Sequence, residues 1–139
     1  MFVVSAQAHY DAAHFLEGYD GKCARLHGHR YVVEAAVAAE ALDEQGIAFD
    51  FSDLKGALRE LAEDLDHVCL NDLPMFQDVP TSAENQARYF FEALSARLPE
   101  ELARGLLYCR IWETPTQWAL YGPSPQWAPT RTPTLEAGG

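Results

Sequence analysis

Two histidines and a cysteine near the N-terminus have types and spacing that could bind a metal. His27 and His29 are two residues apart, and Cys23 stands four residues before His27. Alternate residues of a β-strand share one face, so both imidazoles would point the same way. His14, at the end of the preceding alternating segment, would add a third nitrogen. Three neutral nitrogens with a free fourth position are typical of a catalytic zinc site.

Two other interpretations of these residues remain open. His27 and His29 could be core histidines that hydrogen-bond to the backbone. Alternatively, Cys23 could be the fourth ligand of a closed structural zinc site. Lys22 stands directly before Cys23, and a lysine and a nearby cation both favour the thiolate. A partly exposed thiolate is a good base or nucleophile, so the stretch also fits catalysis.

Two further positions carry groups suited to acid–base chemistry or ligand binding. Asp66 and His67 adjoin at the predicted end of a helix, where the carboxylate and the helix C-terminus would both stabilise an imidazolium. A solvated helix end with a histidine cap is the simpler alternative. Glu113 shares the apolar face of its strand with Cys109 and Ile111, so it points inward and needs a partner. A ligand with two adjacent N–H donors would satisfy it; a strand-end glutamate turned to solvent is the alternative.

The patterning of the chain predicts an α+β fold. Alternation predicts strands at 2–10, 27–37, 106–113 and 118–121, with a short strand at 46–51. Stripes of apolar residues predict two helices, one starting at Ser52 and one at a Thr81–Glu84 capping box. The resulting order, β-β-α-α-β-β, favours an antiparallel sheet covered by two helices on one face. Residues 1–121 form the single predicted domain, and the Pro-rich segment 122–139 is predicted to be a flexible tail.

Composition limits the function. The net charge of −11 over 139 residues, without a basic run, argues against a nucleic-acid partner. No apolar run is long enough for a membrane span, and no secretory signal is visible. Three cysteines at irregular spacing make a disulfide framework improbable. We therefore expect a cytoplasmic protein in which Cys109 is a small core residue and Cys69 has no assigned role.

Taken together, the motifs resemble the 6-pyruvoyl-tetrahydropterin synthase / 6-carboxy-tetrahydropterin synthase family over roughly residues 2–121. The match rests on seven short motifs in the family's order, which makes the resemblance highly specific. They are AAH (12–14), KC (22–23), LHGH (26–29), DF with LK (50–55), LDH with LN (65–71), PT with EN (80–85) and ET (113–114).

The resemblance implies a role for each candidate residue. His14, His27 and His29 correspond to the zinc ligands, and Cys23 to the catalytic base. Asp66 and His67 correspond to a proton-shuttling pair that typically serves the site of a neighbouring subunit. Glu113 corresponds to the anchor of the pterin ring, and Lys22 and Thr81 are expected to be further substrate contacts.

The resemblance also implies a fold, an assembly and a reaction. The fold is the tunnelling fold, whose subunits join edge to edge into a β-barrel, usually in a hexamer. The substrate is 7,8-dihydroneopterin triphosphate. The three residues between Cys23 and His27 resemble the compact spacing of the 6-carboxy enzymes of queuosine biosynthesis, which release triphosphate and acetaldehyde. The 6-pyruvoyl reaction of the tetrahydrobiopterin route and a non-catalytic pterin- or zinc-binding module are the alternatives.

Overall fold

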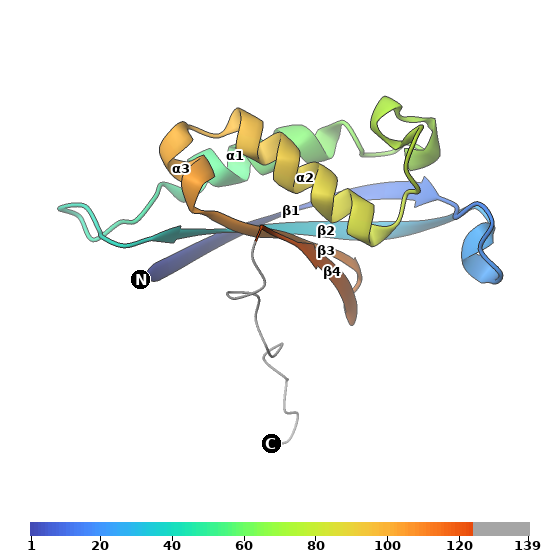
Figure 1. Cartoon of the computed structure of the whole chain (residues 1–139), viewed down its shortest axis with the longest axis horizontal. Helices are drawn as coiled ribbons and strands as arrows, with labels where there is room; N and C mark the ends of the chain where they lie inside the picture. The colour runs from blue at the N-terminus through green and yellow to red at the C-terminus, as the bar shows by residue number, and fades with distance from the viewer. Residues whose placement is uncertain (124–139) are drawn as a thin grey trace, which may run out of the picture.

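The fold is an antiparallel sheet covered on one face by helices, as Figure 1 shows for the computed structural model. The structure describes residues 1–123. The predicted flexible tail at 122–139 therefore lies, beyond its first two residues, outside the described residues. The α+β class and the layer arrangement predicted from the sequence are confirmed.

Four strands form the sheet in the order β1-β2-β3-β4. The first two, β1 (Phe2–His14) and β2 (His27–Ala39), pair along their whole lengths, whereas β3 (Leu106–Thr114) pairs with β2 only as far as Val32. The last strand, β4 (Gln117–Tyr121), completes a hairpin with β3 that bends away from the other two strands (Figure 1). The segment of β2 from His27 to Tyr31 therefore has β1 on one side and no strand on the other among the described residues.

Three helices lie on one face: α1 (Phe51–Glu63), α2 (Ala83–Arg97) and the short α3 (Glu100–Gly105). Their apolar stripes pack onto the alternate, inward-facing residues of the sheet. In each helix and strand, the face that the sequence pattern marks as apolar is therefore the buried one. Tyr10 and Tyr31 are directly paired across β1 and β2, and their stacked rings lie 5.1 Å apart at the centre of this core. Cys109 is also fully buried here, as predicted.

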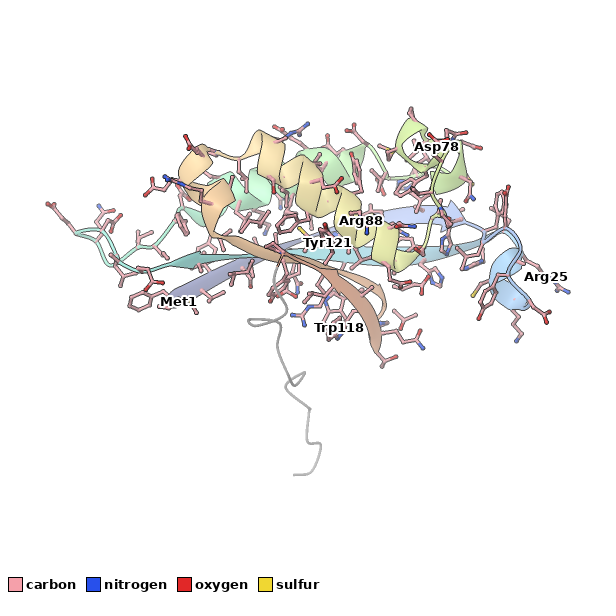
Figure 2. All side chains as sticks on the ribbon, viewed as in Figure 1. Met1, Arg25, Asp78, Arg88, Trp118 and Tyr121 are labelled. Atoms are coloured by element: carbon pink, nitrogen blue, oxygen red, sulfur yellow. The ribbon has the colours of Figure 1, made fainter. Side chains whose placement is uncertain are left out.

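The open face of the sheet carries a buried ion pair. The Arg110 guanidinium donates two hydrogen bonds, of 2.9 and 2.7 Å, to Glu34 Oε2, and the two side chains are only 11% and 9% exposed. Arg110 also lies over the rings of Trp112 and Trp118, 5.2 and 4.9 Å from their centroids. Figure 2 shows Trp118 on this face, away from the helices. Aromatic side chains thus shield the pair from solvent.

Local details differ from the sequence predictions. Segment 46–51 forms no strand: Gly46 has φ 78° and the Asp43 carboxylate accepts the Gln45 and Ile47 N–H groups, which makes a turn. Asp50, rather than Ser52, caps α1, because its carboxylate accepts the Ser52 N–H.

The second helix begins one residue later than predicted. Ser82, rather than Thr81, caps α2 and accepts the Asn85 N–H. Pro99 ends α2 as expected but stands at the cap position of α3, a helix that the sequence analysis missed. Among the described residues, no helix has the length and hydropathy needed to cross a bilayer.

Candidate active site

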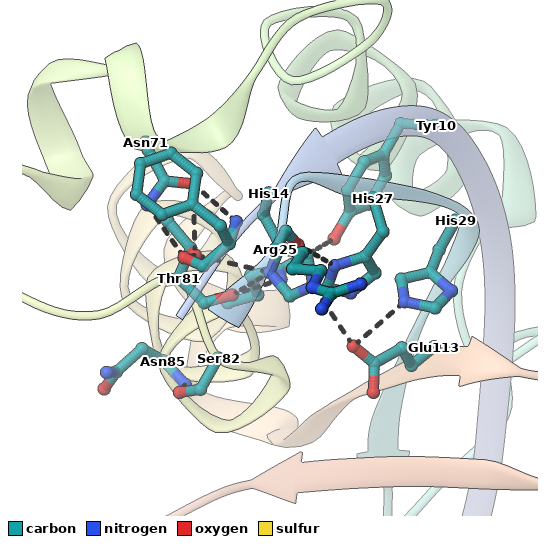
Figure 3. A network of polar contacts seen from close by, with 12 residues as sticks. Tyr10, His14, Arg25, His27, His29, Asn71, Thr81, Ser82, Asn85 and Glu113 are labelled. Atoms are coloured by element: carbon teal, nitrogen blue, oxygen red, sulfur yellow. Dashed lines mark hydrogen bonds and ion pairs between the residues drawn. The ribbon is translucent and has the colours of Figure 1, made fainter. Parts of the chain in front are cut away.

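Strand pairing brings the three predicted metal ligands together. His14 and His27 are directly opposite each other at the ends of β1 and β2, and His29 lies opposite Ala12 on the same face as His27. The Nε2 atoms of His14 and His27 are 3.1 Å apart. The imidazoles are arranged edge to face, with ring centroids 4.6 to 5.7 Å apart. The three rings therefore converge on one point instead of splaying apart (Figure 3).

Glu113 joins this group from the end of β3. Its Oε1 lies 3.4 Å from His14 Nε2 and 3.5 Å from His29 Nε2. One ligand atom from each of the four residues lies within 4.8 Å of all the others. We call His14, His27, His29 and Glu113 the histidine–glutamate cluster. Its donor set, three imidazole nitrogens with one carboxylate, could hold a divalent metal ion.

The surroundings of His14 and His29 favour the neutral imidazole, which is the form that binds metals. Burial lowers the pKa of His14, which is 1% exposed, below its ordinary value. Burial also lowers the pKa of His29. Both rings are therefore neutral at pH 7, which is the state that a metal ligand requires. The Nδ1 atoms of His14 and His27 lie 2.8 and 2.6 Å from the backbone oxygens of Thr81 and Arg25. These contacts turn both Nε2 atoms toward the cluster.

Thr81 supports the cluster from behind. Its side chain is 1% exposed, and its Oγ1 lies 3.3 Å from His14 Nδ1 and donates to Phe15 O at 3.2 Å. Asn71 holds the same chain segment, because its side chain accepts the Phe15 N–H and donates to Phe15 O. Thr81 therefore lies buried behind His14, and its contact with a substrate stays a prediction.

Cys23 lies on a short turn between β1 and β2, four residues before His27. It belongs to the 3₁₀ turn η1 (Lys22–Ala24) and carries a free, partly exposed thiol. The Leu16 N–H donates to Cys23 O at 2.8 Å, which holds the turn against the segment after β1, and Arg25 O contacts His27 of the cluster. Among the described residues, the sulfur is not part of the group of atoms that could share one ion. Lys22 is exposed on the same turn.

Asp66 and His67 form a hydrogen-bonded pair just beyond α1. His67 Nδ1 lies 2.7 Å from Asp66 Oδ2, and the Asp66 Oδ1 accepts the Asp11 N–H at 2.8 Å. The Asp11 N–H and the His67 contact lower the pKa of the Asp66 carboxyl, which keeps it ionised. His67 has φ 57° and a side chain that is 79% exposed, so the imidazole projects outward and Nε2 is accessible on the surface formed by residues 1–123.

Two surface hollows flank the cluster. One, of about 630 Å³, is lined by His29, Glu113 and Trp112 and lies where the β3–β4 hairpin bends away from β2. The other, of about 530 Å³, runs between His29 and His67. His29 thus borders both hollows, and His67 lines the second together with it.

Comparison with known proteins places the chain in a family. The family model described as 6-pyruvoyl tetrahydropterin synthase matches residues 3–124. The 6-carboxy-5,6,7,8-tetrahydropterin synthase of Haemophilus influenzae is 31% identical over 143 aligned positions, which cover 87% of this chain and 99% of the relative. The enzyme of the same name from Synechocystis is 37% identical, with 87% and 93% of the two chains covered.

A solved structure agrees in fold. The 6-pyruvoyl tetrahydropterin synthase of Caenorhabditis elegans superposes with a TM-score of 0.79 at 27% identity, covering 88% of this chain and 96% of that one. The sequence match spans the strands and helices that build the histidine–glutamate cluster. This chain belongs to the 6-pyruvoyl tetrahydropterin synthase family.

Proposed function

We propose that this chain is a zinc-dependent 6-carboxy-tetrahydropterin synthase. It would convert 7,8-dihydroneopterin triphosphate into 6-carboxy-5,6,7,8-tetrahydropterin and release triphosphate and acetaldehyde. The observation that carries the proposal is the convergence of three imidazoles beside Glu113, in a chain whose cited bacterial relatives are named 6-carboxy-5,6,7,8-tetrahydropterin synthases.

His14, His27 and His29 would hold the zinc ion through their Nε2 atoms. When bound, the ion supplies a Lewis acid for the side-chain hydroxyls of the substrate, which makes the adjacent C–H groups more acidic. Glu113 would accept two N–H groups of the pterin ring and so fix the reacting side chain near the metal. Its position at the edge of the 630 Å³ hollow supports this role.

Proton transfer would fall to Cys23 and the Asp66–His67 pair. The Cys23 thiolate would take a proton from a side-chain carbon of the substrate that carries a hydroxyl, and His67 Nε2 would exchange a second proton. Asp66 would hold the His67 ring through Nδ1. Lys22, adjacent in sequence and exposed, would favour the Cys23 thiolate and offer a cation to the triphosphate. The position of the sulfur outside the cluster favours a base over a fourth zinc ligand.

We also propose that copies of this chain join through the two edges of the sheet, β1 and β4, into a β-barrel, with a hexamer as the complete assembly. Within it, the exposed Asp66–His67 pair would serve the site of a neighbouring subunit. Size-exclusion chromatography with light scattering tests the subunit number directly.

Release of acetaldehyde tests the reaction most simply. Zinc-loaded protein is supplied with 7,8-dihydroneopterin triphosphate, and acetaldehyde is followed by reduction with alcohol dehydrogenase and NADH; the Cys23→Ala variant is the control. Stoichiometric acetaldehyde from the unchanged protein alone supports the proposal. Triphosphate release with a pyruvoyl product and no acetaldehyde selects the 6-pyruvoyl reaction, and no turnover selects a non-catalytic pterin-binding module.

A further inference from the structure

His14 has a polar partner on each side of its ring. Its Nε2 faces the cluster, 3.1 Å from His27 Nε2, while its Nδ1 lies 2.8 Å from the backbone oxygen of Thr81. A carbonyl oxygen can only accept, so the hydrogen of the neutral ring must sit on Nδ1. The lone pair is then left on Nε2, where a metal would bind. The position of the Thr81 carbonyl therefore decides whether His14 is ready to act as a ligand.

A second side chain holds that carbonyl. Gln86 Nε2 donates to Thr81 O at 2.9 Å, and Gln86 Oε1 accepts the Tyr10 hydroxyl at 2.6 Å. Gln86 and Tyr10 are fully buried, and His14 and Thr81 are each 1% exposed. Because the Thr81 carbonyl can only accept, the NH₂ group of Gln86 must point at Thr81, and the amide oxygen is left to accept the Tyr10 hydroxyl. Figure 3 shows Tyr10 and Thr81 on either side of His14.

We infer that Gln86 is a positioning residue for His14, which acts by fixing the Thr81 carbonyl that holds the His14 ring with Nε2 toward the metal. This inference rests on the proposed zinc site and assigns to α2 a part in building it. A glutamine in the core otherwise costs free energy, because both ends of its amide must be satisfied away from water. The Tyr10–Gln86–Thr81–His14 chain satisfies every member and ends at a ligand.

A purely structural role predicts something different, and Tyr10 supplies the matched control. Tyr10→Phe removes one buried hydrogen bond of Gln86 but leaves the Gln86–Thr81 bond in place. Gln86→Met removes both with little change in side-chain volume. If Gln86 only stabilised the core, zinc affinity would fall in step with melting temperature in both variants. If Gln86 positions His14, zinc affinity falls much more in Gln86→Met than in Tyr10→Phe, whatever the two melting temperatures are.

The experiment compares full-length wild type, Gln86→Met and Tyr10→Phe in two assays. Zinc affinity is measured by competition with a chromophoric chelator. The location of the ring hydrogen on His14 is read from imidazole ¹⁵N shifts of the metal-free protein. We expect on the order of a tenfold loss of zinc affinity in Gln86→Met, with a new Nε2–H population of His14, and less than about a threefold loss in Tyr10→Phe at a similar melting temperature.

Equal zinc affinity in wild type and Gln86→Met, with His14 unchanged in the ¹⁵N spectrum, would overturn the inference. Losses of affinity that follow melting temperature equally in both variants would overturn it as well. Failure of wild type to bind zinc is a separate result: it would reject the proposed function. The ¹⁵N measurement needs no metal and would still report on the Gln86–His14 link.

Discussion

Replacing Glu113 with alanine should separate pterin binding from metal binding. In the proposed site, the carboxylate accepts two N–H groups of the pterin ring, and each such bond to a charged acceptor contributes about 1.5–3 kcal/mol. Losing both removes about 3–6 kcal/mol, which corresponds to roughly 10²–10⁴-fold weaker pterin binding at about 1.4 kcal/mol per tenfold. The three imidazoles that would hold zinc remain in place, so one zinc per chain is expected to be retained.

The geometry makes this prediction a demanding one, because Glu113 Oε1 is only 3.4 and 3.5 Å from two of the imidazole nitrogens. The assay pairs fluorescence titration of a dihydropterin with zinc counted per chain by mass spectrometry. Glu113→Gln is the control, since it keeps the shape and one acceptor and should show an intermediate affinity. Loss of zinc from Glu113→Ala with pterin affinity unchanged would show that Glu113 is a fourth metal ligand, and the reasoning above would be wrong.

Four further predictions concern Cys23, Cys109, Arg110 and His67. Cys23→Ala should keep zinc and pterin binding but lose turnover, and a fully active variant would reject Cys23 as the base. Iodoacetamide should modify Cys23 and spare Cys109, because burial raises the pKa of the Cys109 thiol far above its ordinary value; peptide mass mapping would show the reverse if the environments were misassigned. Arg110→Met should lower the free energy of unfolding by roughly 3–5 kcal/mol, because the buried Glu34 carboxylate loses its partner, and urea titration giving a loss below about 1 kcal/mol would contradict this. Co-expressed Cys23→Ala and His67→Ala chains should regain partial activity if the pair serves a neighbouring subunit, and no recovery would place both residues in one chain's site.

Face parity made much of the site readable from the sequence. A period of two put His27, His29 and Tyr31 on one side of β2, and the pairing of β1 with β2 then set His14 opposite His27. The apolar stripe of each helix likewise indicated which side of the helix packs on the sheet. These features depend on local repetition, which a single sequence displays directly.

Contacts set by tertiary packing could not be predicted in the same way. Gln86 reads as an ordinary residue of α2, and its link to His14 exists only because the Thr81 carbonyl, just before that helix, meets the end of β1. The Glu34–Arg110 pair depends on the register of β2 with β3, which shifts near Val37. The predicted helix caps were wrong because a second residue able to cap stands close by. Asp50 caps α1 in place of Ser52, and Ser82 caps α2 in place of Thr81. Adjacent capping residues are not distinguished by pattern alone.

The coordination of the zinc-loaded protein shows whether three histidines hold the ion and leave its fourth position open. X-ray absorption at the zinc edge separates nitrogen ligands at about 2.0–2.1 Å from a thiolate at about 2.3 Å. We expect three histidine nitrogens, an exchangeable oxygen in the fourth position, and loss of the zinc in His27→Ala. A sulfur ligand from Cys23 in the resting protein, with no exchangeable position, would contradict it.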